Sequence, residues 1–304
     1  MEVERTTISG PVSGPRLLIM AGVHGDELEP ILAVRRLARR LRRSPPLAGS
    51  VTLVPIANPS ACRLKQRCGS DGLDLARTFP GRSHGSLTER IAWELTKLIQ
   101  SADCLIDLHT GGAKYDLWPL AGYLLHSDPL VLAEQRRMAR AFNLPVVWGT
   151  DANVSGRSLS AARDANKPAI YVEYRGGRAV DRVGVERLVD GCLHVIAALD
   201  MSRLPEATCQ VRYFAEDARA GAGHLQAAHP APVVGRFSAV VQPGDQVTRG
   251  QLLGVIKTQT DQSIEIRSQQ DGRVVCIHRP TPVTADEGVA VVVSFLSAPV
   301  AEQL

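Results

Sequence analysis

The sequence lacks any long apolar run and any strong excess of charge. No stretch approaches the ~20 consecutive apolar residues that a membrane span needs, and the first ten residues, MEVERTTISG, carry charges where a signal peptide has its apolar core. The 35 basic residues against 31 acidic ones give a net charge of +4, which is too small to indicate nucleic-acid binding. We therefore expect a cytoplasmic protein with no membrane and no nucleic-acid partner.

The sequence also lacks paired cysteines. Its six cysteines show no CxxC pair and no zinc-knuckle spacing: Cys62, Cys68, Cys104, Cys192, Cys209 and Cys276. This pattern argues against a metal site built from sulfur. In a cytoplasmic chain we expect these cysteines to be reduced structural thiols.

What is present is the composition of an ordinary globular protein, with 44% apolar and 22% charged residues in a chain of 304. The apolar run that begins at Leu17 predicts a buried strand, residues 27–41 have helical periodicity, and the run from Val51 predicts a second strand. A strand, a helix and a strand in this order favour a parallel pair with a right-handed crossover. Residues 58–81 are polar and glycine-rich, which predicts a long loop.

The same alternation of helices and strands continues to about residue 199. Ser86 and Glu89 form a capping-box pattern for a helix that reaches about residue 100, and residues 104–109, 145–149 and 168–174 predict further strands. Beyond Pro205, short alternating strands separated by Gly and Pro replace the helical pattern. We expect an α/β catalytic domain over residues 1–204 and a β-rich domain over residues 205–304.

Four polar side chains follow predicted strands, namely His24, Glu27, His109 and Glu173. In open α/β sheets the ligand site lies outside the carboxyl ends of the strands. Two histidines and one carboxylate form a ligand set that a catalytic zinc ion uses, with a fourth position left for water. Asp107 lies two residues before His109, on the same face of the strand, and could orient that imidazole. An ordinary hydrogen-bonded histidine at a strand end is the alternative for His109.

Read together, four ordered motifs resemble the succinylglutamate desuccinylase/aspartoacylase family. They are His24-Gly25-Asp26-Glu27, the segment from Asp74 to Gly81, the segment from Asp107 to Gly112, and Glu173. The resemblance extends over nearly the whole chain. It implies the fold of the zinc carboxypeptidase-like superfamily, a mixed sheet flanked by helices.

The resemblance also implies roles for single residues. One zinc ion per chain would be held by His24, Glu27 and His109, and Glu173 would be the general base. The family arginine that polarises the scissile carbonyl corresponds to Arg67, with Arg63 as a competitor because the loop before Asp74 is longer here.

Two more arginines would contact substrate by the same resemblance. Arg77 belongs to the sequence Asp74-Leu75-Ala76-Arg77, in which Ala76 replaces an asparagine of the family. Arg77 can still bind a carboxylate with two hydrogen bonds, whereas Ala76 has no side-chain amide to donate. Arg163, ten residues before Glu173, corresponds to a further substrate-binding arginine.

The C-terminal segment resembles a biotinyl/lipoyl-like β-barrel. No lysine-bearing tripeptide of the carrier type stands between Ile256 and Gln269, so Lys257 is not expected to be modified. We expect this domain to form a lid or an assembly surface, which leaves open a homo-oligomer.

These features predict a zinc-dependent amidohydrolase that cleaves the linear amide of a small N-acylated amino acid or related compound. The alternatives are a metallocarboxypeptidase that acts on peptides and a non-catalytic relative that binds a ligand. The acyl group, the amine portion and the physiological metal are not given by the sequence.

Overall fold

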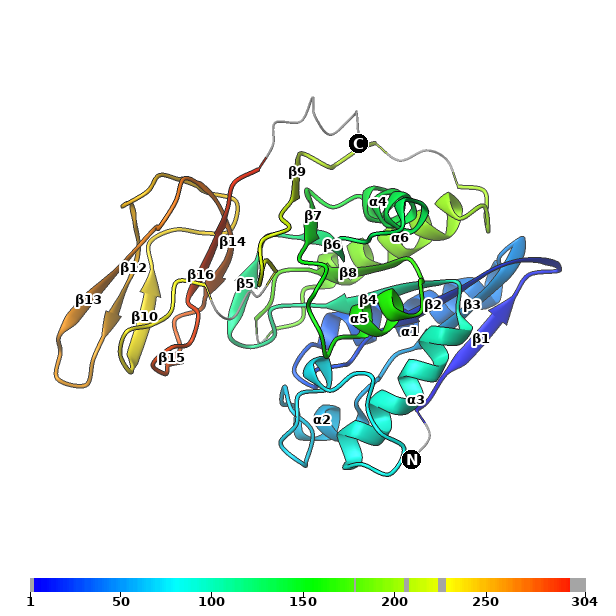
Figure 1. Cartoon of the computed structure of the whole chain (residues 1–304), viewed down its shortest axis with the longest axis horizontal. Helices are drawn as coiled ribbons and strands as arrows, with labels where there is room; N and C mark the ends of the chain where they lie inside the picture. Colours follow the sequence, from blue (N-terminus) through cyan, green and yellow to red (C-terminus); the bar gives the residue numbers. More distant parts are fainter. Residues whose placement is uncertain (1–2, 178, 205–207, 224–227, 296–304) are drawn as a thin grey trace.

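A computed structural model describes residues 3–177, 179–204, 208–223 and 228–295. An eight-stranded sheet lies between two layers of helices, and a smaller β-rich part is attached beside it (Figure 1). The order of strands in the large sheet is β1-β3-β2-β4-β8-β6-β7-β9. The sheet contains parallel pairs and the two antiparallel pairs β1–β3 and β6–β8. The prediction of a mixed sheet flanked by helices is confirmed.

The strands of the large sheet are β1 (Thr6–Ser9), β2 (Val12–Met20), β3 (Ala48–Val54), β4 (Cys104–His109), β6 (Leu120–Leu124), β7 (Val146–Thr150), β8 (Ala169–Glu173) and β9 (Tyr213–Glu216). The α-helices are α1 (Leu28–Arg43), α2 (Pro59–Leu64), α3 (Leu87–Ser101), α4 (Pro129–Phe142), α5 (Ser158–Asp164) and α6 (Arg182–Ala198). β2 and β3 form the expected parallel pair across α1.

The two faces of the large sheet carry separate hydrophobic cores. Helices α1, α4 and α6 cover one face, where Leu37, Met138 and Val189 share one core with buried residues of β2 and β4. Helices α3 and α5 cover the other face, where Leu95 and Leu159 pack in the second core. Successive strand residues point to opposite faces, so β4 contributes to both cores and its end is held firmly between them.

Local sequence signals explain the helix bounds. Pro30 lies in the first turn of α1, where a missing N–H costs nothing. Ser86 and Glu89 form the predicted capping box of α3. The predicted loop over residues 58–81 contains α2 and a short 3-10 helix, Leu75–Arg77, which the polar composition concealed.

The C-terminal part consists of two small sheets. Its strands are β10 (Gly235–Ala239), β11 (Gln246–Val247), β12 (Leu252–Lys257), β13 (Ser263–Arg267), β14 (Gly272–His278), β15 (Pro282–Val283) and β16 (Ala290–Val293). Among the described residues neither sheet closes on itself, so the predicted barrel is not confirmed. β9 pairs with β7 in the large sheet although it follows residue 204. The division into two domains at that residue stays a prediction.

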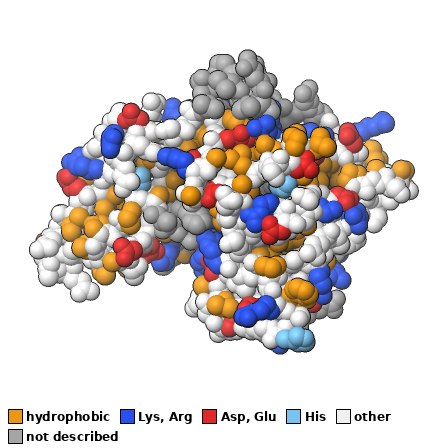
Figure 2. All heavy atoms as spheres, in the orientation of Figure 1, with side chains coloured by type: hydrophobic (Ala, Val, Ile, Leu, Met, Phe, Trp, Pro, Cys, Tyr) orange, Lys and Arg blue, Asp and Glu red, His pale blue; other side chains and the backbone are white. Residues whose placement is uncertain are grey.

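A short strand joins the two parts of the molecule. β5 (Tyr115–Leu117) follows closely after His109 and pairs with β14, so that Leu117 lies opposite Cys276. The C-terminal part is therefore attached beside the end of β4. Figure 2 shows basic and acidic side chains interspersed on one face of the molecule. Within the described ranges, no helix has both the length and the apolar character that crossing a membrane requires.

Candidate active site

The turn after β2 brings His24 and Glu27 together. It packs so tightly against α2 that a Cβ on Gly25 would lie 1.9 Å from the carbonyl oxygen of Ala61. Only glycine fits there, because that contact is far inside the van der Waals distance. Glu27 is the residue immediately before α1, which fixes its backbone. The tight packing therefore explains why this short sequence can hold two buried polar side chains in a defined orientation.

His24, Glu27 and His109 form one buried cluster at the ends of β2 and β4. One ligand atom from each lies within 4.8 Å of the others. The two Glu27 oxygens are shared, since Oε1 lies 2.6 Å from Nδ1 of His24 and Oε2 lies 3.1 Å from Nδ1 of His109. The backbone N–H of Thr110 also donates to Oε2 of Glu27 (3.1 Å). The structure thus brings all three predicted zinc ligands together.

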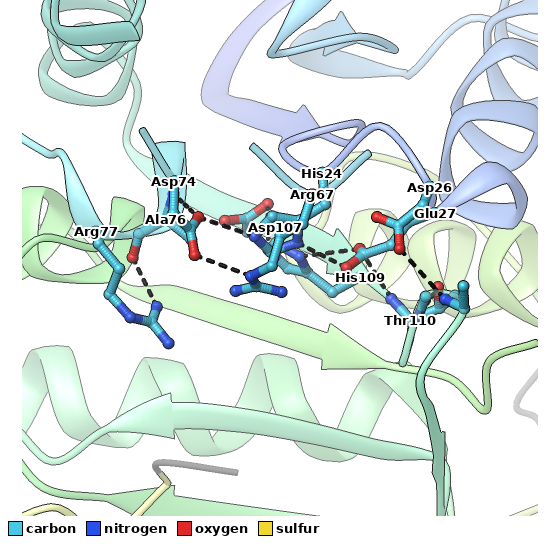
Figure 3. Close-up of polar contacts among 12 residues, drawn as sticks. His24, Asp26, Glu27, Arg67, Asp74, Ala76, Arg77, Asp107, His109 and Thr110 are labelled. Atoms are coloured by element: carbon cyan, nitrogen blue, oxygen red, sulfur yellow. Dashed lines mark hydrogen bonds and ion pairs between the residues drawn. The ribbon is translucent and has the colours of Figure 1, made fainter. Parts of the chain in front are cut away.

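The outer nitrogen of each imidazole faces a second carboxylate. Nε2 of His24 lies 3.2 Å from Oδ1 of Asp74, and Nε2 of His109 lies 3.2 Å from Oδ1 of Asp107 (Figure 3). The predicted contact between Asp107 and His109 is therefore present. A neutral imidazole that donates through Nε2 presents its Nδ1 lone pair to the centre of the cluster. Both histidines share this orientation.

The carboxylates of the site are ionised differently. Burial alone would raise the pKa of Glu27, but the imidazoles of His24 and His109 hold it below its usual range. Burial raises the pKa of Glu173 to about 7. Glu173 lies beside His109 in the register of β8 and β4, and its Oε2 is buried without a hydrogen-bond partner. A carboxyl group with this pKa can take up and release a proton near neutral pH.

Arg67 and Arg77 line the cavity above this cluster. Nε of Arg67 donates to Oδ2 of Asp74 (2.9 Å), and Nη1 of Arg77 donates to the carbonyl oxygen of Ala76 (2.8 Å). Asp74 and Glu27 raise the pKa of Arg67 although burial opposes them, so the guanidinium stays charged. Arg63 is exposed on α2 and does not line the cavity. Of the two competing arginines, the structure brings only Arg67 into this site.

The cavity is covered from the C-terminal side. Cys276 of β14 and Gly223, which follows β9, contribute to its wall together with Tyr115 and Leu117 of β5. Cys276 comes from the attached β-rich part and Gly223 from the segment that leads to it, whereas Tyr115 and Leu117 belong to β5, the strand that pairs with β14. The site is therefore a pocket between the large sheet and the C-terminal part, with walls on both sides.

Comparison with known proteins agrees with this geometry. The family model described as the succinylglutamate desuccinylase/aspartoacylase catalytic domain matches residues 13–199. The chain belongs to this family.

Single proteins of known name or structure are similar to this chain beyond residue 199, so the similarity includes the C-terminal part. The N-alpha-acetyl-L-2,4-diaminobutyric acid deacetylase of Halomonas elongata is 30% identical over 312 residues, covering 94% of this chain and 84% of that protein. A succinylglutamate desuccinylase/aspartoacylase structure from Rhodobacter sphaeroides has a TM-score of 0.86 at 28% identity, covering 98% and 90% of the two chains. The product-bound ectoine utilization protein EutE (DoeB) of Ruegeria pomeroyi has a TM-score of 0.85 at 26% identity, covering 95% and 88%.

Arg163, which the family spacing singles out, does not line the cavity of this family member. Its guanidinium donates to the carbonyl oxygens of Ala152 and Val154 and pairs with Asp164. These contacts hold the loop that precedes α5. The structure thus gives Arg163 a contact with the protein backbone, and no observation here supports its predicted contact with substrate.

Arg157, which the sequence analysis missed, lies in the cavity instead. Its Nε is buried without a hydrogen-bond partner, and burial lowers the pKa of its guanidinium. Tyr171 of β8 also lines the cavity, and its hydroxyl is likewise buried and unpartnered. Arg157 lies in a loop with no recognisable motif, so only the fold could reveal that it faces the site.

Proposed function

We propose that this chain is a zinc-dependent amidohydrolase that cleaves the linear amide of a small N-acylated amino acid. The observation that carries the proposal is the buried cluster of His24, Glu27 and His109 with Glu173 beside it in one covered cavity. The name of the Halomonas elongata relative, a deacetylase of an acetylated diamino acid, supports this reaction class. Family membership supports it as well.

The chemistry of the cluster suits zinc. Two imidazole nitrogens and a carboxylate are a common ligand set of catalytic zinc sites, and three protein ligands leave one position for water. His24 and His109 each face a further carboxylate through the outer nitrogen, as imidazole ligands of metals usually do. When bound, a zinc ion supplies a Lewis acid that polarises a carbonyl and lowers the pKa of water.

The remaining residues would carry out proton transfer and charge stabilisation. Glu173 takes the proton from the attacking water and delivers it to the departing amine nitrogen. Arg67 donates hydrogen bonds to the carbonyl oxygen as negative charge develops on it, and one such donor is worth roughly 3–4 kcal/mol in other enzymes. The products are a carboxylate and a free amine.

Substrate recognition would depend on the cationic wall of the cavity. Arg77 and Arg157 both line it, and guanidinium groups bind carboxylates with two parallel hydrogen bonds. We infer that the substrate carries a carboxylate that these two arginines share. An N-acetylated amino acid has such a carboxylate two bonds from the amide nitrogen, and we name this class as the first to test.

A metallocarboxypeptidase would use the same chemistry on longer substrates. Such an enzyme needs a cleft that stays open along several substrate residues. Here Cys276 of β14 and Gly223 close one side of the cavity, which favours a small substrate. A non-catalytic ligand-binding relative would have no need of Glu173, whose buried carboxyl group would only cost stability. The cytoplasmic location, the homo-oligomer and the domain boundary at 204 stay predictions.

Metal analysis and a substrate panel test the proposal. The purified protein is expected to hold one zinc per chain and to release amine from N-acetyl, N-succinyl or N-formyl amino acids. Glu173→Gln is expected to keep the zinc and to lower kcat about 10²–10⁴-fold, the usual contribution of a general base. Glu265→Gln, at an exposed position in β13, is the matched control. Absence of stoichiometric zinc, or release of amine from peptides only, would overturn the proposal.

A further inference from the structure

Ser158 lines the cavity beside the candidate metal centre and has no role in the function proposed above. It is the first residue of α5 and is 3% exposed. Its hydroxyl donates a hydrogen bond to Oδ2 of Asp107, which is itself 2% exposed. Two buried polar groups therefore face each other in the wall of the cavity.

The contact continues to the cluster. Oδ1 of Asp107 lies 3.2 Å from Nε2 of His109, and Nδ1 of the same ring lies 3.1 Å from Glu27. A carboxylate that contacts only an imidazole can rotate about its last side-chain bond. The hydroxyl of Ser158 donates to the second oxygen, Oδ2, and thereby fixes the plane of the Asp107 carboxylate. The position of Oδ1, and with it the orientation of the His109 ring, is then fixed as well.

We propose that Ser158 is a positioning residue that orients His109 through Asp107. The inference rests on the proposed function, since His109 must bind the metal for its orientation to matter. Arg157 precedes Ser158 directly and also lines the cavity. The start of α5 would then hold a substrate contact and a support of the metal centre on adjacent residues.

The test measures metal binding apart from turnover. Zinc is removed from wild type and from Ser158→Ala with a chelator, and each apo-protein is titrated with zinc against a competing indicator. We expect Ser158→Ala to bind zinc about 10-fold more weakly, in the range seen when outer partners of metal ligands are removed. The visible absorption of the cobalt-substituted variant should differ from that of wild type. Its kcat should fall with little change in KM, and Ser158→Thr, which keeps a hydroxyl, should restore the zinc affinity.

Thr96→Val is the matched control. It removes another buried hydroxyl, which donates to the carbonyl oxygen of Pro80, and Thr96 does not line the cavity. The inference is overturned if Ser158→Ala keeps the zinc affinity and cobalt spectrum of wild type, or if its apo form fails to fold while Thr96→Val folds. If wild type itself binds no zinc or hydrolyses no N-acyl amino acid, the proposed function fails instead, and the two failures are distinct.

Discussion

The two halves of the cavity differ in how their polar atoms are satisfied. In the metal half, each imidazole nitrogen of His24 and His109 faces a carboxylate oxygen of the protein. In the substrate half, Nε of Arg157, the hydroxyl of Tyr171 and Oε2 of Glu173 are buried without a hydrogen-bond partner. Leaving such groups unpaired costs about 1–3 kcal/mol each. Oδ1 of Asp107, which lies 3.2 Å from Nε2 of His109 but has no hydrogen-bond partner, is an exception in the metal half. We infer that the atoms left unpaired in the substrate half serve to bind a ligand.

Breaking the metal half should have the largest effect. His24→Ala removes one of the two proposed nitrogen ligands and leaves Asp74 and Glu27 without the imidazole that both contact. We expect loss of stoichiometric zinc and a fall in kcat/KM of more than about 10³-fold, since the Lewis acid and the water it acidifies are lost together. Zinc content and amine release measure this. His84→Ala, at an exposed position, should leave both unchanged.

Breaking the substrate half should raise KM and leave the metal in place. Arg157→Ala removes a guanidinium whose Nε has no hydrogen-bond partner, and hydrogen bonds to a charged group contribute about 1.5–3 kcal/mol, so KM should rise about 10–100-fold at normal zinc content. Arg163→Ala is the control. Its guanidinium binds backbone carbonyls outside the cavity, so its KM should stay close to wild type while its melting temperature falls. If instead Arg163→Ala raised KM and Arg157→Ala did not, Arg163 would be the residue that contacts substrate.

The same difference explains which parts of the site the sequence could predict. His24 and Glu27 lie three residues apart at a strand end, and His109 follows a second strand, so local pattern and topology suffice to bring them together. The family resemblance favoured Arg67 over Arg63, and of these two only Arg67 lines the cavity.

The substrate half depends on loops whose course no local signal encodes. Counting ten residues back from Glu173 selected Arg163, which does not line the cavity. A spacing of this kind transfers between relatives only where the intervening loop keeps its length. The barrel was expected because the C-terminal segment resembles a biotinyl/lipoyl-like domain. Whether a sheet closes into a barrel depends on the pairing of strands far apart in the sequence, which local motifs do not specify. β6 and β9 were missed because Leu120–Leu124 and Tyr213–Glu216 are short and lie next to proline or polar residues.

The cost of the unpaired Glu173 should be visible in the apo-protein. Its folded pKa of about 7 lies above the ordinary glutamate value, so the folded state binds more protons than the unfolded state between these values. Stability should therefore fall as pH rises from about 4.5 to about 7, by on the order of 1–3 kcal/mol in total. Glu173→Gln removes this titration, so urea unfolding of the apo form should show a gain over wild type at pH 8 and little difference at pH 4.5.

Glu265→Gln provides the comparison for that experiment, since its carboxylate is exposed beside Arg267. This variant should follow the pH dependence of wild type throughout. If apo Glu173→Gln shows no gain at pH 8, the carboxylate is accommodated in its ionised form, and the substrate half is less strained than the unpaired oxygen indicates.

The smallest expected effect concerns Ala76, which by the resemblance described above stands where the family has an asparagine. Ala76 lines the cavity beside Arg77, and its backbone N–H is already used by Asp74 (2.9 Å). Ala76→Asn adds a side-chain amide that can donate to a carboxylate held by Arg77, and one neutral donor contributes about 0.5–1.5 kcal/mol. KM for an N-acetyl amino acid should therefore fall about 2–10-fold, whereas Ala76→Val, which adds volume without a donor, should raise it. If both variants raise KM, the space left by alanine is itself what the substrate requires, and the substrate half is shaped by volume at this position rather than by a missing hydrogen bond.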